Sequence, residues 1–276
     1  MIRRNYLTTL EAIILGLVQG LTEFLPISSS GHLVLVEALF HIHKGNIIFE
    51  VFLHFGTFMA VVIAFRNDIR QMILACYRWV IHPASTKIQW QNDLHLRLAV
   101  FIIIGTVPAA ILGLTFETYL ESVFSEPFTV SLMLLLTGII LYFTRWSKIK
   151  HQRIKFIDSI FIGLAQAVAM LPGISRSGST ISMGMYLGLS KEEAARFSFL
   201  LALPAILGAT VLKATALIQN PLPEGQLFNL IAATVVAFIS GYFAILFLLE
   251  LVRRGKFSWF AFYCLTVAIA GMVYFH

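Results

Sequence analysis

Two short polar segments interrupt an otherwise apolar chain and carry most of the side chains that can do chemistry. The first runs from Gly16 to His32 and the second from Gly163 to Ser179, so they align without a gap at an offset of 147 positions. Serine, histidine and carboxylate groups can attack phosphorus or transfer protons, and arginine can hold phosphate. Paired segments of this kind, broken by glycine and proline, indicate a site at the interface of two repeats in a membrane protein.

Gln19 and Glu23 lie four residues apart, which places them on one face of a helix that Pro26 ends. A carboxylate inside a membrane is energetically costly, so Glu23 is a candidate functional residue. The alternative is a glutamate near a helix end whose carboxylate reaches water.

A run of small polar residues follows, Ser28-Ser29-Ser30-Gly31, and His32 comes directly after it. Hydroxyls and free backbone N–H groups at the start of a helix form a ready anion site. His32 adds an acid or base beside them. On its own, the serine run also fits an ordinary helix cap and turn.

The second segment has an arginine where the first has a serine, because Arg176 aligns with Ser29. We infer that one turn presents nucleophile and acid/base groups, and that the other presents a guanidinium able to hold phosphate through two hydrogen bonds. The alternative for Arg176 is a buried ion pair with Glu23. The residues that we expect to bind the phosphate of a substrate in the two turns are Ser28, Ser30, Gly31, Ser175, Ser177, Gly178 and Thr180.

Three residues outside the two turns receive structural interpretations. His54 lies in an apolar segment, where we interpret it as a packed or hydrogen-bonded histidine rather than a site residue. Cys76 and Cys264 have no ligand or redox spacing, so we interpret them as structural thiols.

The elements that position these residues must be membrane helices. The chain has 276 residues, of which 58% are hydrophobic and only 12% charged, against about 25% charged in soluble proteins. Strand-like alternation is absent, which favours an all-α integral membrane protein over a barrel.

A net charge of +6 does not indicate nucleic acid, because the basic residues cluster in loops beside spans. About six spans are expected, near 49–65, 97–116, 128–144, 197–218, 228–249 and 257–275.

Loop charge predicts the topology. The basic loops 66–97, 145–155 and 253–256 are expected in the cytoplasm, and the acidic connections 117–127 and 219–227 outside. Segment 71–81 fits either this first loop or a further short helix.

The two polar segments then form re-entrant helical hairpins, within residues 7–42 and 156–192, whose turns meet near the midplane. We expect one membrane domain over residues 1–276, built from an inverted-topology repeat with halves of about 1–146 and 147–276.

The two segments resemble a known family. Residues 19–32, QGLTEFLPISSSGH, are similar to the first signature of the bacterial undecaprenyl-diphosphate phosphatases, the bacitracin-resistance proteins, and residues 172–180, PGISRSGST, to the second. The likeness extends along essentially the whole chain. It implies interlocking inverted repeats in the bacterial inner membrane. It also implies an enzyme that removes the terminal phosphate of undecaprenyl diphosphate on the outer side, regenerating the lipid carrier of cell-wall synthesis.

The resemblance also implies roles for single residues. Ser29 matches the nucleophile proposed for the family, and His32 and Arg176 match its other essential positions. A divalent cation, Mg²⁺ or Ca²⁺, is implied as cofactor. The family signature opens with Glu or Gln four residues before a Glu, here Gln19 and Glu23, and the neutral amide is the weaker metal ligand. The expected partners are the polyprenyl diphosphate and membrane lipids, and a homodimer is compatible with the sequence.

Two mechanisms and two rival functions stay open at this point. Ser29 attacks the terminal phosphorus while His32 takes its proton and Glu23 orients His32 or the metal, or water activated by His32 attacks instead. A transporter or lipid flippase would also use inverted repeats with broken helices. A purely structural membrane subunit would leave the intramembrane charges unexplained.

Overall fold

The computed structural model describes residues 8–40, 47–82, 90–124, 126–219 and 226–276. The regular elements in these ranges are helices, with one isolated β-bridge between His151 and Leu189. The all-α prediction is therefore confirmed. The acidic connection predicted at 219–227 lies almost wholly outside the described residues.

Each predicted hairpin is a pair of short helices joined by a tight turn. The first consists of α1 (Thr9–Phe24) and α2 (Ser29–Phe40), and the second of α8 (Phe156–Val168) and α9 (Arg176–Leu187). These helices have 12 to 16 residues, whereas a straight span needs about 20. Such lengths fit re-entrant segments that return to the side from which they entered.

The start of α1 is fixed by a capping box. Thr8 Oγ1 accepts a hydrogen bond from the backbone N–H of Glu11, and the Glu11 carboxylate accepts one from the N–H of Thr8 at 2.7 Å. The helix ends at Leu25, which has extended backbone and precedes a proline. The cap and the proline together set where the first turn begins.

The six predicted spans all coincide with helices. Five are long and apolar enough to cross a membrane, and α3 becomes the sixth when it is counted together with α4 as one bent pair. Segment 71–81 is helical, which confirms the alternative that it forms a helix and not a loop, and it belongs to the longer helix α4. Helix α6 continues to Phe124, so the predicted connection 117–127 is mostly helix. The elements are α3 (Ile47–Ala64), α4 (Arg66–Ile81), α6 (Leu94–Phe124), α7 (Pro127–Phe143), α10 (Lys191–Gln219), α11 (Leu227–Arg253) and α12 (Phe260–Tyr274), with short 3₁₀ turns at Thr144–Trp146 and Phe257–Trp259.

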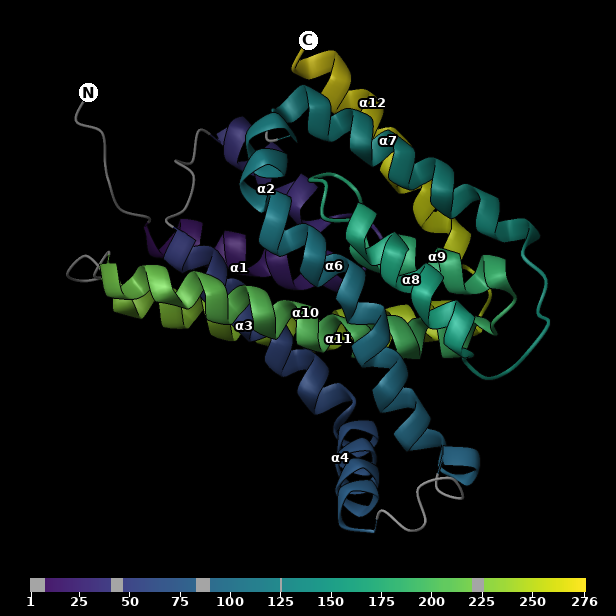
Figure 1. The fold of residues 1–276 in the computed structure, drawn as a ribbon. Helices are drawn as coiled ribbons and strands as arrows, with labels where there is room; N and C mark the ends of the chain where they lie inside the picture. The colour runs from purple at the N-terminus through teal and green to yellow at the C-terminus, as the bar shows by residue number, and fades with distance from the viewer. Residues whose placement is uncertain (1–7, 41–46, 83–89, 125, 220–225) are drawn as a thin grey trace.

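The two halves interlock, because the first helix of each hairpin packs against a span of the other half. Helix α1 lies along α11, and α8 lies along α6 (Figure 1). Glycines permit both approaches: a Cβ at Gly16 would lie 2.6 Å from the Ala233 carbonyl oxygen, and one at the equivalent Gly163 would lie 2.4 Å from that of Gly105. Among the other spans, α7 pairs with α12, and α3 packs against both α11 and α10.

A buried aromatic cluster forms part of the largest hydrophobic core of the described residues. Phe24, Phe197 and Phe199 are almost fully buried, and the rings of Phe24 and Phe199 meet edge to face with centroids 5.8 Å apart. The phenylalanines of α10 therefore pack inside the protein. The cluster supports the end of α1, where the site begins.

Candidate active site

The two hairpin turns meet directly, as the repeated motif predicts. Ser177 Oγ donates a hydrogen bond to the Leu25 carbonyl oxygen at 3.1 Å, and Arg176 Nη2 donates to Glu23 Oε1 at 2.5 Å. These contacts join residues about 150 positions apart in the sequence. The polar residues of both repeats therefore form one cluster.

The turns are built alike at their serines. Ser28 Oγ accepts from the backbone N–H of Gly31 at 3.2 Å, and in the second turn Ser175 Oγ accepts from Gly178 at 3.0 Å. Ser30 and Ser177 each lie with their hydroxyl oxygen 3.3 Å from that of the capping serine. The N–H groups of Gly31 and Gly178, which we predicted to bind phosphate, are thus occupied by helix caps.

The second turn is fixed by Thr137 from α7. Thr137 Oγ1 donates to the Gly173 carbonyl oxygen and accepts from the Ser175 N–H, both at 3.0 Å. Gly173 has a φ of 94°, and a Cβ there would lie 2.5 Å from the Val130 carbonyl oxygen. Only glycine fits this position without a shift of the backbone.

The first turn also holds strained backbone, but at Ser28, which aligns with the extended Ser175 and not with Gly173. Ser28 has a φ of 68° and is the one non-glycine residue with positive φ within the described ranges. Left-handed backbone costs a residue with a Cβ about 1–2 kcal/mol. Strain of this kind persists only where the surroundings fix it, and here it sits directly before Ser29.

Glu23 is the centre of the cluster. Its side chain is 7% exposed and its two oxygens face different partners. Oε1 accepts from Arg176, whereas Oε2 accepts from Ser29 Oγ at 2.6 Å and from Gln19 Nε2 at 2.9 Å. These donors offset the cost of burying the carboxylate. The ion pair of Arg176 with Glu23, which the sequence left as an alternative, is formed in this structure.

His54 of α3 borders the same carboxylate. Its Nδ1 lies 3.1 Å from Gln19 Nε2 and 3.9 Å from Glu23 Oε2, and its side chain is 40% exposed. Because an amide NH₂ can only donate, Nδ1 accepts this bond and the ring proton of the neutral imidazole is on Nε2. The histidine is hydrogen-bonded, as expected, but it also belongs to the site, which sequence reasoning missed. A histidine inside an apolar span was the available signal.

His32 has partners other than Ser29 and Glu23. Its Nδ1 lies 2.8 Å from the Ser28 carbonyl oxygen, which can only accept, so this nitrogen carries a proton. Its Nε2 lies 2.8 Å from the hydroxyl of Tyr263 on α12, and the two rings are within 9° of parallel. In the neutral ring Nε2 accepts from the tyrosine. The structure therefore pairs Ser29 with Glu23, whereas the sequence hypothesis had His32 take its proton.

The other predicted phosphate-binding residues differ in accessibility. Thr180 is fully buried, and its hydroxyl donates to the Arg176 carbonyl oxygen at 2.8 Å and meets Ser198 of α10. It ties α9 to α10 and faces away from the cluster. By contrast Ser29 is partly exposed, Ser30 is exposed, and the Arg176 side chain is 17% exposed.

The donor set can be compared with what a divalent cation requires. Gln19 Oε1 is buried and has no hydrogen-bond partner among the described residues, and the Glu23 carboxylate lies beside the same amide. An unpaired amide oxygen next to a carboxylate is the donor chemistry that Mg²⁺ and Ca²⁺ prefer. Within the described ranges, no three His, Cys, Asp or Glu side chains gather closely enough to hold a metal on their own. These residues therefore fit a weakly held cation with further ligands from substrate or water.

Taken together, the cluster places a hydroxyl nucleophile against a buried carboxylate, with a guanidinium on the far oxygen of that carboxylate. A carboxylate in contact with a serine hydroxyl can accept its proton. A guanidinium can exchange a carboxylate for a phosphate of similar geometry. The arrangement suits transfer of a phosphoryl group.

Comparisons with known proteins agree with this chemistry. The family model described as bacitracin resistance protein BacA matches residues 12–270. Undecaprenyl-diphosphatase 1 of Shouchella clausii is 41% identical over 273 residues, with 97% of each chain covered. The undecaprenyl-diphosphatase of Carboxydothermus hydrogenoformans is 40% identical, with 97% of each chain covered. That of Korarchaeum cryptofilum is also 40% identical, with 94% of this chain and 97% of the relative covered. Matches of this extent and identity place the chain in the BacA family of bacitracin resistance proteins.

Proposed function

We propose that this chain is an undecaprenyl-diphosphate phosphatase whose active site is the cluster around Glu23. The observation that carries the proposal is the pair of contacts on that carboxylate, with Ser29 Oγ at 2.6 Å on one oxygen and Arg176 on the other. The relatives are named for the same activity. The reaction converts undecaprenyl diphosphate and water into undecaprenyl phosphate and phosphate.

Substrate binding replaces the ion pair. The terminal phosphate takes the place of the Glu23 carboxylate on the Arg176 guanidinium, which then meets two phosphoryl oxygens. Glu23 is left with Ser29 and Gln19 as its hydrogen-bond partners. Loss of the guanidinium makes the carboxylate a better proton acceptor, because a nearby positive charge no longer stabilises its ionised form.

The chemical step is in-line attack of Ser29 on the terminal phosphorus. A bond forms from Oγ to phosphorus while the bond from phosphorus to the bridging oxygen breaks, and its electron pair leaves with undecaprenyl phosphate. The serine proton passes to Glu23 and then to the leaving lipid phosphate. Water next attacks the phosphoserine and gives a proton to Glu23. The Ser29 oxygen leaves, recovers that proton and completes the turnover.

A second route keeps Ser29 as a phosphate-binding hydroxyl and uses water as the nucleophile. The two routes differ in one observable, because only the first forms phosphoserine. Rapid acid quenching followed by mass spectrometry of the peptide that contains Ser29 distinguishes them. A phosphorylated Ser29 supports covalent catalysis, and an active Ser29→Ala variant excludes it.

Gln19 and Glu23 are the residues that would hold a divalent cation, Mg²⁺ or Ca²⁺. When bound, the cation neutralises part of the charge that spreads over the phosphoryl oxygens. His54 lies close enough to orient the Gln19 amide through its hydrogen bond. His32, held between Ser28 and Tyr263, maintains the turn that carries Ser29.

The protein is a multi-pass membrane protein, with five or six helices suited to spanning. We place it in the bacterial inner membrane, with the basic loops in the cytoplasm. The family resemblance further implies that the site is accessible from the outer face. There it would return the lipid carrier to cell-wall synthesis and reduce the diphosphate available to bacitracin. Assembly as a homodimer stays a prediction.

Phosphate release by the purified protein in detergent tests this function. We expect cation-dependent release from a polyprenyl diphosphate, abolished by EDTA and by either Ser29→Ala or Arg176→Ala. Ser258→Ala and Arg145→Ala change the same residue types outside the cluster and should leave release unchanged. Absence of release under every cation, with the lipid still bound, would contradict the proposal and favour a lipid transporter.

A further inference from the structure

Helix α4 leaves the transmembrane body at a sharp bend. Helix α3 ends at Ala64, and α4 begins at Arg66 with its axis turned by 78° (Figure 1). A helix that turns through nearly a right angle at the end of an apolar segment can run along the membrane surface, so that α3 alone enters the bilayer. Its mixed apolar and basic composition is typical of helices in the interfacial region.

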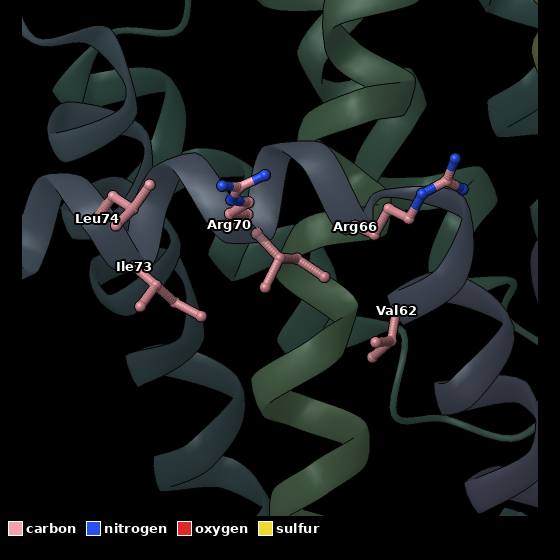
Figure 2. A pocket seen from close by; sticks show the side chains of 6 residues that line it. Val62, Arg66, Arg70, Ile73 and Leu74 are labelled. Carbon is pink, nitrogen blue, oxygen red and sulfur yellow. The ribbon is translucent and has the colours of Figure 1, made fainter.

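A shallow groove of about 260 Å³ lies at this bend. Its surface is apolar and is formed by four apolar side chains and the carbon stems of two arginines: Val62, Arg66, Ile69, Arg70, Ile73 and Leu74. Figure 2 shows the guanidinium groups of Arg66 and Arg70 toward the top of the view, with Val62 and Ile73 below them. Ile73 is 63% exposed, so an apolar surface continues from the groove along α4.

The two arginines of the groove lack acidic partners. Arg66 donates only to the backbone oxygen of Ile63, at 3.3 Å, and neither it nor Arg70 forms an ion pair within the described residues. The nearest acidic residue in the sequence, Asp68, accepts instead from Arg196 Nε at 2.9 Å. Two positive charges four residues apart on one helix therefore stay uncompensated beside an apolar surface.

We propose that this groove binds one anionic phospholipid. The lipid phosphate lies between Arg66 and Arg70, and an acyl chain follows Val62, Ile69 and Ile73. The combination of paired basic side chains at the membrane surface with an adjacent apolar floor matches a lipid that carries net negative charge. The acyl chain of a zwitterionic lipid would fit the apolar residues of the groove equally well. Its headgroup, however, would bring a positive charge close to the two arginines. The proposal concerns residues apart from the active site and does not depend on the proposed function.

Native mass spectrometry of the full-length protein in detergent tests the site. We expect one molecule of phosphatidylglycerol to stay bound under conditions that release phosphatidylcholine with the same acyl chains. Each arginine near a lipid surface contributes about a fivefold factor in affinity. The double variant Arg66→Gln/Arg70→Gln should therefore bind phosphatidylglycerol about 25-fold more weakly, and Arg66→Lys/Arg70→Lys should retain most of the affinity.

Helix α4 itself supplies the matched control. Arg78 lies on the same helix, but its guanidinium pairs with Asp93 at 3.1 Å. Arg78→Gln should leave phosphatidylglycerol binding unchanged, and thermal unfolding verifies that each variant is folded. Equal binding of the two lipids, or an equal loss in Arg78→Gln, would overturn the proposal. Displacement of phosphatidylglycerol by an equal concentration of polyprenyl phosphate would also overturn it, because the groove would then belong to the product lipid.

Discussion

Ser29 Oγ donates a hydrogen bond to Glu23 Oε2 at 2.6 Å, and this bond joins the first residue of α2 to the last helical turn of α1. The same carboxylate receives Arg176 from the other repeat on its second oxygen. The candidate nucleophile Ser29 and the phosphate-binding guanidinium of Arg176 therefore both bind the carboxylate of Glu23, which is also the proton acceptor. A change in the partner of Arg176 alters the basicity of Glu23, so substrate binding and activation of Ser29 are coupled.

Glu23→Gln tests that coupling. The amide keeps the size of the side chain and can still accept from Ser29, but it cannot take a proton and leaves Arg176 without its ion partner. General base catalysis contributes about 10²–10⁴-fold, so we expect phosphate release to fall by at least about a hundredfold. The rate with saturating polyprenyl diphosphate measures the effect.

Asp158→Asn is the control for Glu23→Gln. Asp158 is also a buried carboxylate, but it caps α8 by accepting from the Lys155 N–H at 2.9 Å and lies outside the cluster. The control should lower thermal stability and leave the rate per folded molecule unchanged. An unchanged rate in Glu23→Gln would mean that another group accepts the serine proton.

Tyr263→Phe tests whether Tyr263 acts on the site through His32. The tyrosine hydroxyl lies 2.8 Å from His32 Nε2, and its loss frees the imidazole to leave the turn. A hydrogen bond of this kind contributes about 0.5–1.5 kcal/mol, so we expect kcat to fall by a factor of about 2 to 10. Tyr274→Phe, an exposed position on the same helix, should have no effect.

A double-variant cycle separates this positioning role from a general loss of packing. If Tyr263 acts through His32, Tyr263→Phe should cost almost nothing further in a His32→Ala background. If Tyr263→Phe lowers kcat by the same factor with and without His32→Ala, Tyr263 supports the fold without acting on His32.

Much of this fold follows from the sequence for physical reasons. Apolar segments of span length have few alternatives to helices in a membrane. The repeated Ser/Gly pattern predicts two similar turns, and the structure builds both with a serine cap, Ser28 in one and Ser175 in the other. The hairpins meet because each first helix packs through glycine against the opposite half, and Gly16 and Gly163 mark those positions.

The side-chain pairing inside the site could not be predicted in the same way. His32 follows Ser29 closely in sequence, which suggested that they interact, but Tyr263 from 231 positions away and the Ser28 carbonyl occupy the imidazole. His54 reaches Gln19 only because α3 packs beside α1. Such contacts depend on helix packing between distant segments, which local spacing does not report.

Gly173→Ala tests the fixed geometry of the second turn. The positive φ and the nearby Val130 carbonyl oxygen leave no room for a Cβ, so we expect a loss of about 2 kcal/mol of stability. This corresponds to a fall in Tm of roughly 4–8 °C. Gly208→Ala is the control, because nothing lies within 4 Å of its Cβ position and alanine favours a helix. Equal Tm values for the two variants would contradict the strained turn.

Gln19 should set how strongly the site holds its cation. Its Oε1 is buried without a partner among the described residues, and its Nε2 donates to the Glu23 carboxylate. Gln19→Glu therefore replaces a neutral ligand by a second negatively charged one. We expect Gln19→Glu to lower the Mg²⁺ or Ca²⁺ concentration for half-maximal phosphate release by about tenfold, and Gln19→Leu to raise it. Cation titration of EDTA-treated protein measures both shifts.

The second repeat provides the control for this cation prediction. Gln166 aligns with Gln19, is buried, and has both amide atoms unpartnered within the described part of the chain, but Met170 stands where the first repeat has Glu23. Without that carboxylate, an amide oxygen alone attracts a divalent cation weakly. Gln166→Leu should therefore leave the cation response unchanged, and an unchanged response in all three variants would assign the cation to the substrate phosphates instead of Gln19.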